Sequence, residues 1–150
     1  MGCMNDGKTG DRRQATGDGQ PRPPLRLVSD IAERLLDFGI AALRLASGLP
    51  KDPAGRHVAI QLIRSATGGG ANYEEARAAE SRDDFVHKIG VAAKEIRETN
   101  YWLALIERSG WGADPSGLIR EAGELSAILG ASARTARANA RAAKTRATSG

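Results

Sequence analysis

The sequence has little cysteine, few aromatic residues and no long apolar run, and each shortage excludes a class of protein. The lone Cys3 cannot form a disulfide within the chain. One cysteine and two histidines in the whole chain are too few for a Cys/His zinc site. No apolar run approaches the ~20 residues of a membrane helix, and the N-terminus lacks the apolar region of a signal peptide. We therefore expect a cytoplasmic protein with no membrane partner. Aromatic residues make up 4% of the 150 residues, so the core must consist of Leu, Ile, Val and Ala, which favours helices.

The net charge of +4 conceals an uneven distribution of charged residues. Residues 1–26 carry five basic and three acidic side chains, whereas residues 132–150 carry five basic and no acidic ones. Residues 27–131 are therefore mildly acidic. Since the excess positive charge lies at the two ends, contact with a polyanion is expected to begin there.

Composition divides the chain into three parts. Residues 1–26 are rich in Gly, Asp, Gln, Arg and Pro, and have too few apolar side chains to offset the entropy cost of ordering, so we predict a disordered tail. Residues 27–131 are predicted to form one folded domain. Residues 132–150, rich in Ala and Arg, are predicted to be a basic extension of the last helix or a tail.

Within the folded part, apolar residues recur at alternating intervals of three and four, which is the spacing of amphipathic helices. The pattern predicts helices over residues 28–47, 53–79 and 82–109, and a fourth helix from residue 115 onward. Short connections join them, and no segment alternates like a strand. The predicted fold is therefore all-α, an antiparallel up-down-up-down four-helix bundle.

Residues that favour helix termini support these boundaries. Asp52-Pro53 and Asp114-Pro115 each combine an N-cap side chain with a proline at the first helical position. Ser81 and the acid three residues later resemble a capping box. Three glycines at 68–70 interrupt the second helix and cost roughly 1 kcal/mol each relative to Ala. We interpret them as a kink where another backbone comes close.

Four motifs in this order carry a family resemblance. They are QLIRSA at 61–66, GANYEEA at 70–76, SRDDFVHK at 81–88 and KEIRETNYWL at 94–103. Together they closely resemble the four-helix bundle proteins first noticed in intervening sequences of bacterial 23S ribosomal RNA genes, over about residues 27–111. The resemblance implies a small, non-enzymatic bundle that tends to form rings, with five subunits as the expected number.

That family is similar in fold to the accessory variability determinant of diversity-generating retroelements, a basic pentameric bundle that works with a reverse transcriptase and nucleic acid. The resemblance therefore implies three kinds of partner: further copies of this chain in a homo-oligomer, RNA or DNA, and a reverse transcriptase or another protein. The segment 1–26 and the extension after Gly130 depart from the usual short form. Functions assigned to them gain no support from the family.

No motif predicts catalysis, a cofactor or a metal. Asp84-x-x-His87 matches half of a ferritin-like metal motif, but His57 has Ala54 rather than a carboxylate three residues before it, so the second copy is missing. No Gly-Lys-Ser/Thr follows the three glycines, and no Gly-x-Ser-x-Gly elbow is present. We expect a protein that is not an enzyme.

The family motifs contain a group of polar residues that we expect to be structural. Antiparallel pairing of the second and third helices places Arg64 near Glu95 or Glu98, and Asn72 nearer residue 90. An Arg–Glu pair there would fix helix register more than it adds stability, and removing Arg64 would leave a partly buried acid unpaired, at a cost on the order of 3 kcal/mol. The alternative is a polar groove for a partner.

Two further sets of residues are candidate interaction sites. The predicted nucleic-acid-binding residues lie in the basic extension, where four of them recur at intervals of three, four and three and a fifth follows: Arg134, Arg137, Arg141, Lys144 and Arg146. The alternative is a solvated tail, and base-specific readout has no support because the tail has no aromatic residue on which a base could stack. The predicted oligomer interface lies beside or outside the Leu103 and Ile106 seam, and comprises Tyr101, Trp102 and Leu105.

These observations predict a non-catalytic, self-associating helical bundle that acts as an adaptor and contacts RNA or DNA through its basic ends. The alternative is a protein-binding oligomeric scaffold without nucleic acid, in which the ends are spacers.

Overall fold

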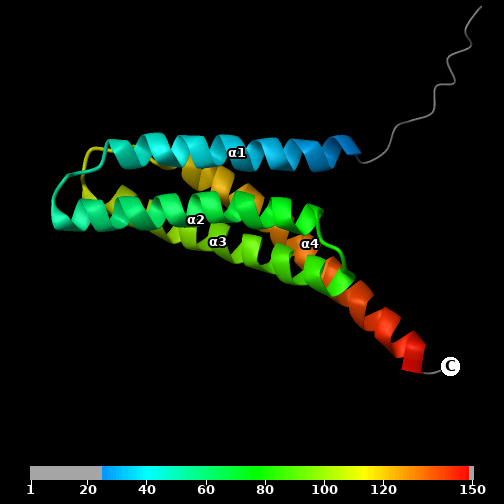
Figure 1. The fold of residues 1–150 in the computed structure, drawn as a ribbon. Coiled ribbons are helices and arrows are strands. Elements are labelled where there is room, and N and C mark those ends of the chain that lie inside the picture. Colours follow the sequence, from blue (N-terminus) through cyan, green and yellow to red (C-terminus); the bar gives the residue numbers. More distant parts are fainter. Residues whose placement is uncertain (1–24, 149–150) are drawn as a thin grey trace, which may run out of the picture.

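The computed structural model describes residues 25–148, with side chains from Asp30 onward. It contains four helices, shown in Figure 1: α1 (Leu25–Ser47), α2 (Pro53–Arg77), α3 (Arg82–Ser109) and α4 (Ser116–Thr148). Successive helices run in opposite directions, so the predicted all-α, up-down-up-down bundle is confirmed. Of the predicted disordered tail, residues 1–26, the first 24 lie outside the described residues. Helix α1 begins at Leu25, three residues before the predicted start, so residues 25 and 26 are helical.

The predicted caps are in place at three helix N-termini. The Asp52 carboxylate accepts a hydrogen bond from Gly55 N at 2.8 Å, and Ser81 Oγ accepts one from Asp84 N at 3.1 Å. Before α4, Asp114 Oδ1 accepts from Ser116 N at 3.0 Å. These bonds satisfy N–H groups that the first turn of a helix leaves unpaired, so local sequence fixes where α2, α3 and α4 begin.

The core follows the apolar seams that the sequence predicts. On α3 the predicted seam is buried from Ile89 to Ile106, and its first member, Phe85, is half-buried. Leu35 and Phe38 of α1, Leu62 of α2, and Leu125 and Leu129 of α4 complete the interior. Each helix packs mainly against the next in sequence, and α1 has its smallest contact with α4. The faces of α1 therefore differ in how well they are covered.

Helix α2 continues through its three glycines and ends at Arg77, two residues before the predicted end. A close approach is present at the glycines, but it is made by a side chain and not by the expected second backbone: a Cβ at Gly69 would lie 2.4 Å from Ile96 Cδ1. A Cβ at Gly68 would lie 3.1 Å from Glu95 Oε2. Glycine is therefore used here so that α3 side chains can sit directly on the backbone of α2.

Between the two alternatives for the basic extension, the structure favours the helix, because α4 runs without interruption to Thr148. Ala133 and Ala140 are buried on this part of α4. Arg82 Nη1 donates to Asn139 O at 3.3 Å, so the extension also packs against the start of α3. Figure 1 shows the final turns of α4 projecting past the other helices. The basic residues are thus carried on a helix.

Candidate functional site

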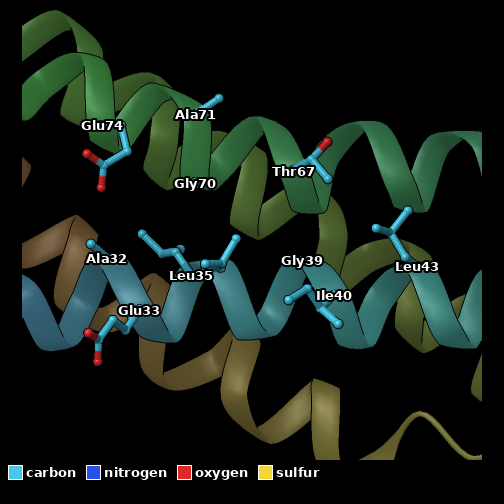
Figure 2. Close-up of a pocket in the computed structure, with 11 residues that line it drawn as sticks. Ala32, Glu33, Leu35, Gly39, Ile40, Leu43, Thr67, Gly70, Ala71 and Glu74 are labelled. Carbon is cyan, nitrogen blue, oxygen red and sulfur yellow. The ribbon is translucent and has the colours of Figure 1, made fainter.

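An apolar groove of about 450 Å³ lies between α1 and α2 (Figure 2). Its walls are apolar or small side chains, with Glu74 on α2 and Glu33 on α1 on opposite sides of one end. The lining residues are Ala32, Glu33, Leu35, Leu36, Gly39, Ile40, Leu43, Thr67, Gly70, Ala71 and Glu74. The groove has an apolar floor and an acidic rim at one end.

The groove exists because α1 carries two apolar stripes and α2 covers only one of them. Leu35 faces the core, whereas Leu36, Ile40 and Leu43 remain 65%, 38% and 42% exposed. The α2 residues opposite are small, and a Cβ at Gly70 would be in ordinary contact with Leu35 Cβ at 3.7 Å. The helices therefore approach closely while the outer leucines and isoleucine of α1 stay uncovered.

Ile60 extends this exposed apolar surface along α2. It is 62% exposed, and it precedes Thr67 by seven residues, which places both on the same side of the helix. Among the described residues, five large apolar side chains are classed as exposed, and Leu36, Ile40, Leu43 and Ile60 account for four of them. We call these four residues the apolar face.

The apolar face is not among the predicted sites, and the predicted oligomer interface lies instead on α3. Of the three residues predicted there, Tyr101 is 61% exposed, but Trp102 and Leu105 are half-buried against the core. The Trp102 ring meets His57 edge-on, with centroids 5.9 Å apart, and its Nε1 donates to Glu98 Oε1 at 3.3 Å. Trp102 is therefore held by contacts within its own chain.

Tyr101 borders a second hollow on the outer side of α3. Tyr101, Ala104, Leu105, Arg108 and Ser109 line this space of about 460 Å³. The Tyr101 ring stands edge-on to Trp102 at 5.0 Å, so its position is partly fixed. We call this surface the Tyr101 patch, and it presents an aromatic ring beside a guanidinium group.

The predicted Arg64 pair forms, but at the surface. Arg64 Nη2 donates to Glu98 Oε1, while its Nε donates to Gln61 Oε1 at 3.2 Å. The Arg64 side chain is 55% exposed and that of Glu98 is 35% exposed, so the acid is partly buried, as predicted, while the guanidinium reaches solvent. The helix pairing was predicted correctly, but the rotation of α2 turns Arg64 outward.

Among the described residues, Asn72 and Glu95 form no hydrogen bond or ion pair with Arg64. Asn72 Nδ2 donates to Gly68 O at 2.9 Å, within its own helix. Glu95 lies over Gly68, and its Oε2 is buried without a hydrogen-bond partner among the described residues. Glu95 therefore lies in the α2–α3 contact, whereas Asn72 bonds within α2.

An ion-pair network joins α1 to α4, and no sequence pattern indicated it. Arg34 donates from Nε to Glu121 Oε1 at 2.8 Å and from Nη2 to Glu121 Oε2 at 3.0 Å, a two-pronged contact. Its Nη2 also donates to Glu124 Oε2 at 2.7 Å. The Glu121 hydrogen bonds raise the pKa of Arg34 above its usual range. These contacts bridge the pair of helices that pack least.

The five predicted nucleic-acid-binding residues are all exposed on α4. Two of them face α3: Arg137 lies over Gly90, and Lys144 Nζ pairs with Asp83 Oδ2 at 2.9 Å. Arg134 lies back along its own helix toward Gly130, and Arg141 and Arg146 complete the set. The basic stripe is therefore real, and part of it runs along the α3–α4 seam.

Two findings concern residues 25–148 as a whole. In this range no cluster of His, Cys, Asp and Glu is arranged to hold a metal ion. Within the same part of the chain, every helix is too short or too polar to cross a membrane.

The comparison with curated proteins gives no match. Among solved structures, a crystal structure of a protein with unknown function from the S23 ribosomal protein family of Bacteroides thetaiotaomicron is similar. Its TM-score is 0.65 at 28% sequence identity, and the match covers 71% of this chain and 97% of that chain. The sequence profile of the 23S rRNA-intervening sequence proteins matches residues 29–131. This match spans well over half of the chain and agrees with the fold, so the chain belongs to the family of 23S rRNA-intervening sequence proteins.

Proposed function

We propose that this protein is a non-catalytic, self-associating bundle that acts as an adaptor in the cytoplasm. The observation that carries the proposal is the apolar face, in which three large exposed side chains line one groove and a fourth, Ile60, lies further along α2. Soluble monomers rarely leave a contiguous apolar surface of this kind uncovered, because burying it is favourable. The occupant we propose is a second copy of the same chain.

A second copy suits the groove because the molecule has two unlike surfaces that complement each other. The groove is apolar with Glu33 and Glu74 at its rim, whereas the Tyr101 patch offers an aromatic ring and the Arg108 guanidinium. Tyrosine and arginine are enriched at the centres of interfaces. Contact between two unlike patches is head-to-tail, and repeated contacts of this kind close into a ring when the rotation permits. The family resemblance implies five subunits.

The adaptor's second contact, in this proposal, is RNA or DNA along the basic half of α4. Residues 132–148 of α4 carry five exposed basic side chains and no acidic ones, and such a surface gives the salt-sensitive, sequence-independent affinity that phosphate contacts provide. The alternative is an oligomeric scaffold that binds only proteins, such as a reverse transcriptase, and uses α4 as a spacer. Binding of labelled RNA and DNA at two salt concentrations separates these alternatives.

Light scattering coupled to size-exclusion chromatography tests self-association. We expect a mass that is a multiple of 15.8 kDa, and a mass of one chain at micromolar concentration would overturn the proposal. The double substitution Leu36→Gln and Ile40→Gln should dissociate the oligomer without unfolding it, since both side chains are exposed. Asp37→Gln, on the same exposed turn of α1, is the matched control. An oligomer that tolerates the double substitution would remove the groove from the interface.

The other half of the proposed contact has its own test. Tyr101→Ala should also dissociate the oligomer, because it removes the ring that we place in the groove of the next copy. If only the groove substitutions dissociate the oligomer, the groove meets another groove in a two-fold contact, and the proposed ring of subunits is wrong. If neither substitution has an effect, the apolar face serves a different partner.

A further inference from the structure

A polar hollow of about 310 Å³ lies where α4 crosses α3, away from the apolar face. Asp83, His87, Gly90 and Lys94 line it from α3 and Arg137 lines it from α4. The α3 residues follow one another at intervals of four, three and four, so they form one stripe on the helix surface. Two helices thus contribute cationic or N–H-bearing side chains to one space.

Gly90 makes the hollow possible. The Arg137 guanidinium lies over it, with Nη2 only 2.8 Å from the position that a Cβ would occupy. Any side chain at this position would push the guanidinium away. The absence of a side chain at residue 90 therefore lets the Arg137 side chain pack against the backbone of α3, in the hollow that His87 and Lys94 also line.

The charge balance of the hollow is positive. Within residues 30–148, neither Arg137 nor Lys94 has an acidic partner within ion-pair distance. Asp83 is the one acid in the lining, and Lys144 already pairs with it at 2.9 Å. His87 adds a ring N–H donor. The hollow therefore has hydrogen-bond donors and two positive charges without an acidic partner, on Arg137 and Lys94, while its one acid, Asp83, is neutralised by Lys144.

We propose that this hollow binds a phosphate group, with Arg137 as the planar two-pronged donor and Lys94 as the point charge. The phosphodiester of an RNA or DNA strand and a free phosphate ion share this chemistry. We assign the site to a nucleic-acid strand, because Arg141 and Arg146 lie further along the same helix, where a strand leaving the hollow would pass. This inference rests on the proposed nucleic-acid contact and names its anchor.

Substitutions that change charge equally inside and outside the hollow test the assignment. With a short fluorescein-labelled RNA and the full chain, Arg137→Gln and Lys94→Gln should each weaken binding about tenfold, as expected for loss of a charge-assisted hydrogen bond. Arg134→Gln removes the same charge from the same helix but outside the hollow, and should weaken binding much less. Fluorescence anisotropy measures all three.

A pair of glycine variants tests the geometry without changing charge. Gly90→Ala should displace the Arg137 guanidinium and weaken RNA binding several-fold, while the far end of a flexible side chain can move without disturbing the fold. Gly123→Ala is the control, because a Cβ there meets no atom within 4 Å. Melting curves of both variants check that the bundle is intact.

A titration with inorganic phosphate, followed by NMR, separates the possible outcomes. If RNA binds and Arg134→Gln weakens it as much as Arg137→Gln, the hollow is not the anchor, and the nucleic-acid function stands without it. If RNA does not bind but phosphate shifts signals of the hollow in the parent and not in Arg137→Gln, the site is real and the nucleic-acid function is wrong. If neither ligand binds, both are wrong.

Discussion

At the scale of single residues, exposure decides how much the Arg64–Glu98 pair contributes to stability. Both side chains reach solvent, so water and salt screen their attraction. We predict that Arg64→Ala lowers the free energy of unfolding by about 1 kcal/mol or less, instead of the larger loss expected for a buried pair. Urea denaturation of parent and variant measures the difference. A loss of about 3 kcal/mol would mean that the pair is buried after all.

Tyr73 is the residue from which we expect a pH effect. Burial raises the pKa of its phenol, and the Arg77 charge nearby opposes part of that rise. The folded state therefore holds the phenolic proton more tightly than the unfolded state does. This contribution to stability is complete below the ordinary pKa of 10.0 and is lost as the pH rises through the folded value.

The measurement is the melting temperature on either side of pH 10. The parent should lose stability across this interval, and Tyr73→Phe should lose less, because it has no proton to release. Tyr101→Phe, at the exposed tyrosine, is the control for general alkaline effects. Identical pH dependence in the parent and Tyr73→Phe would show that Tyr73 is not the responsible group.

At the scale of elements, the α2–α3 contact depends on Ile96, which is fully buried at its middle. Ile96→Ala deletes buried methyl and methylene groups and leaves a cavity, so we predict a loss of roughly 2 to 5 kcal/mol. The next residue, Arg97, is exposed, and Arg97→Ala should be nearly neutral. A neutral Ile96→Ala with a severe Arg97→Ala would reverse the assignment of the α3 faces.

Gly69 is the partner of Ile96 in this contact, and its substitution should show the coupling. Alanine is favoured over glycine in a helix by roughly 1 kcal/mol, and at the open position Gly123 we predict a gain of that size. At Gly69 the new Cβ would overlap Ile96, so Gly69→Ala should destabilise by about 1 to 3 kcal/mol.

The same substitution made in the Ile96→Ala background tests the cause. There the space that the Cβ needs is empty, so Gly69→Ala should no longer destabilise. A double-mutant cycle in urea gives the coupling energy directly. Additive effects of the two substitutions would show that some other contact explains the glycine.

The helices themselves illustrate what sequence can and cannot predict. Caps such as Asp52 and Ser81, and the seam through Ile96, depend on residues at most four positions apart, so local spacing reveals them. Leu35 and Leu36 are neighbours in sequence, yet one is buried and the other is exposed. Leu36, Ile40 and Leu43 follow one another at intervals of four and three, which is also helical spacing, but only the rotation of α1 against α2 shows that the described residues leave them exposed.

At the scale of the whole molecule, the parts of the candidate sites that depend on helix pairing were predicted, and the parts that depend on helix rotation were not. Antiparallel pairing alone brought Arg64 to Glu98, because it requires only the midpoints of two helices. The Arg34–Glu121 contact joins residues far apart in sequence and depends on how four helices are rotated together. The hollow at Gly90 likewise depends on where α4 crosses α3. The spacing of residues along one helix does not determine how the helices are rotated or where they cross.

The last prediction concerns whether the basic half of α4 is part of the bundle. Ala133 and Ala140 are buried there, and Lys144 pairs with Asp83 at the start of α3. A chain that ends at Gly130 loses these contacts, so we predict a melting temperature lower by several degrees. A chain that ends at Thr145 keeps all of them and should melt like the parent.

Circular dichroism of the two shortened chains decides the matter, and the result bears on every test of nucleic-acid binding. If removal of residues 131–150 destabilises the bundle, loss of RNA binding by that shortened chain mixes two causes, namely missing charges and a weakened α3–α4 contact. Arg137→Gln and Arg134→Gln avoid this ambiguity, because each removes one charge and leaves the buried alanines in place. Equal melting temperatures for the parent and the chain ending at Gly130 would instead make the extension a separable appendage, and simple truncation would then be a fair test of what it binds.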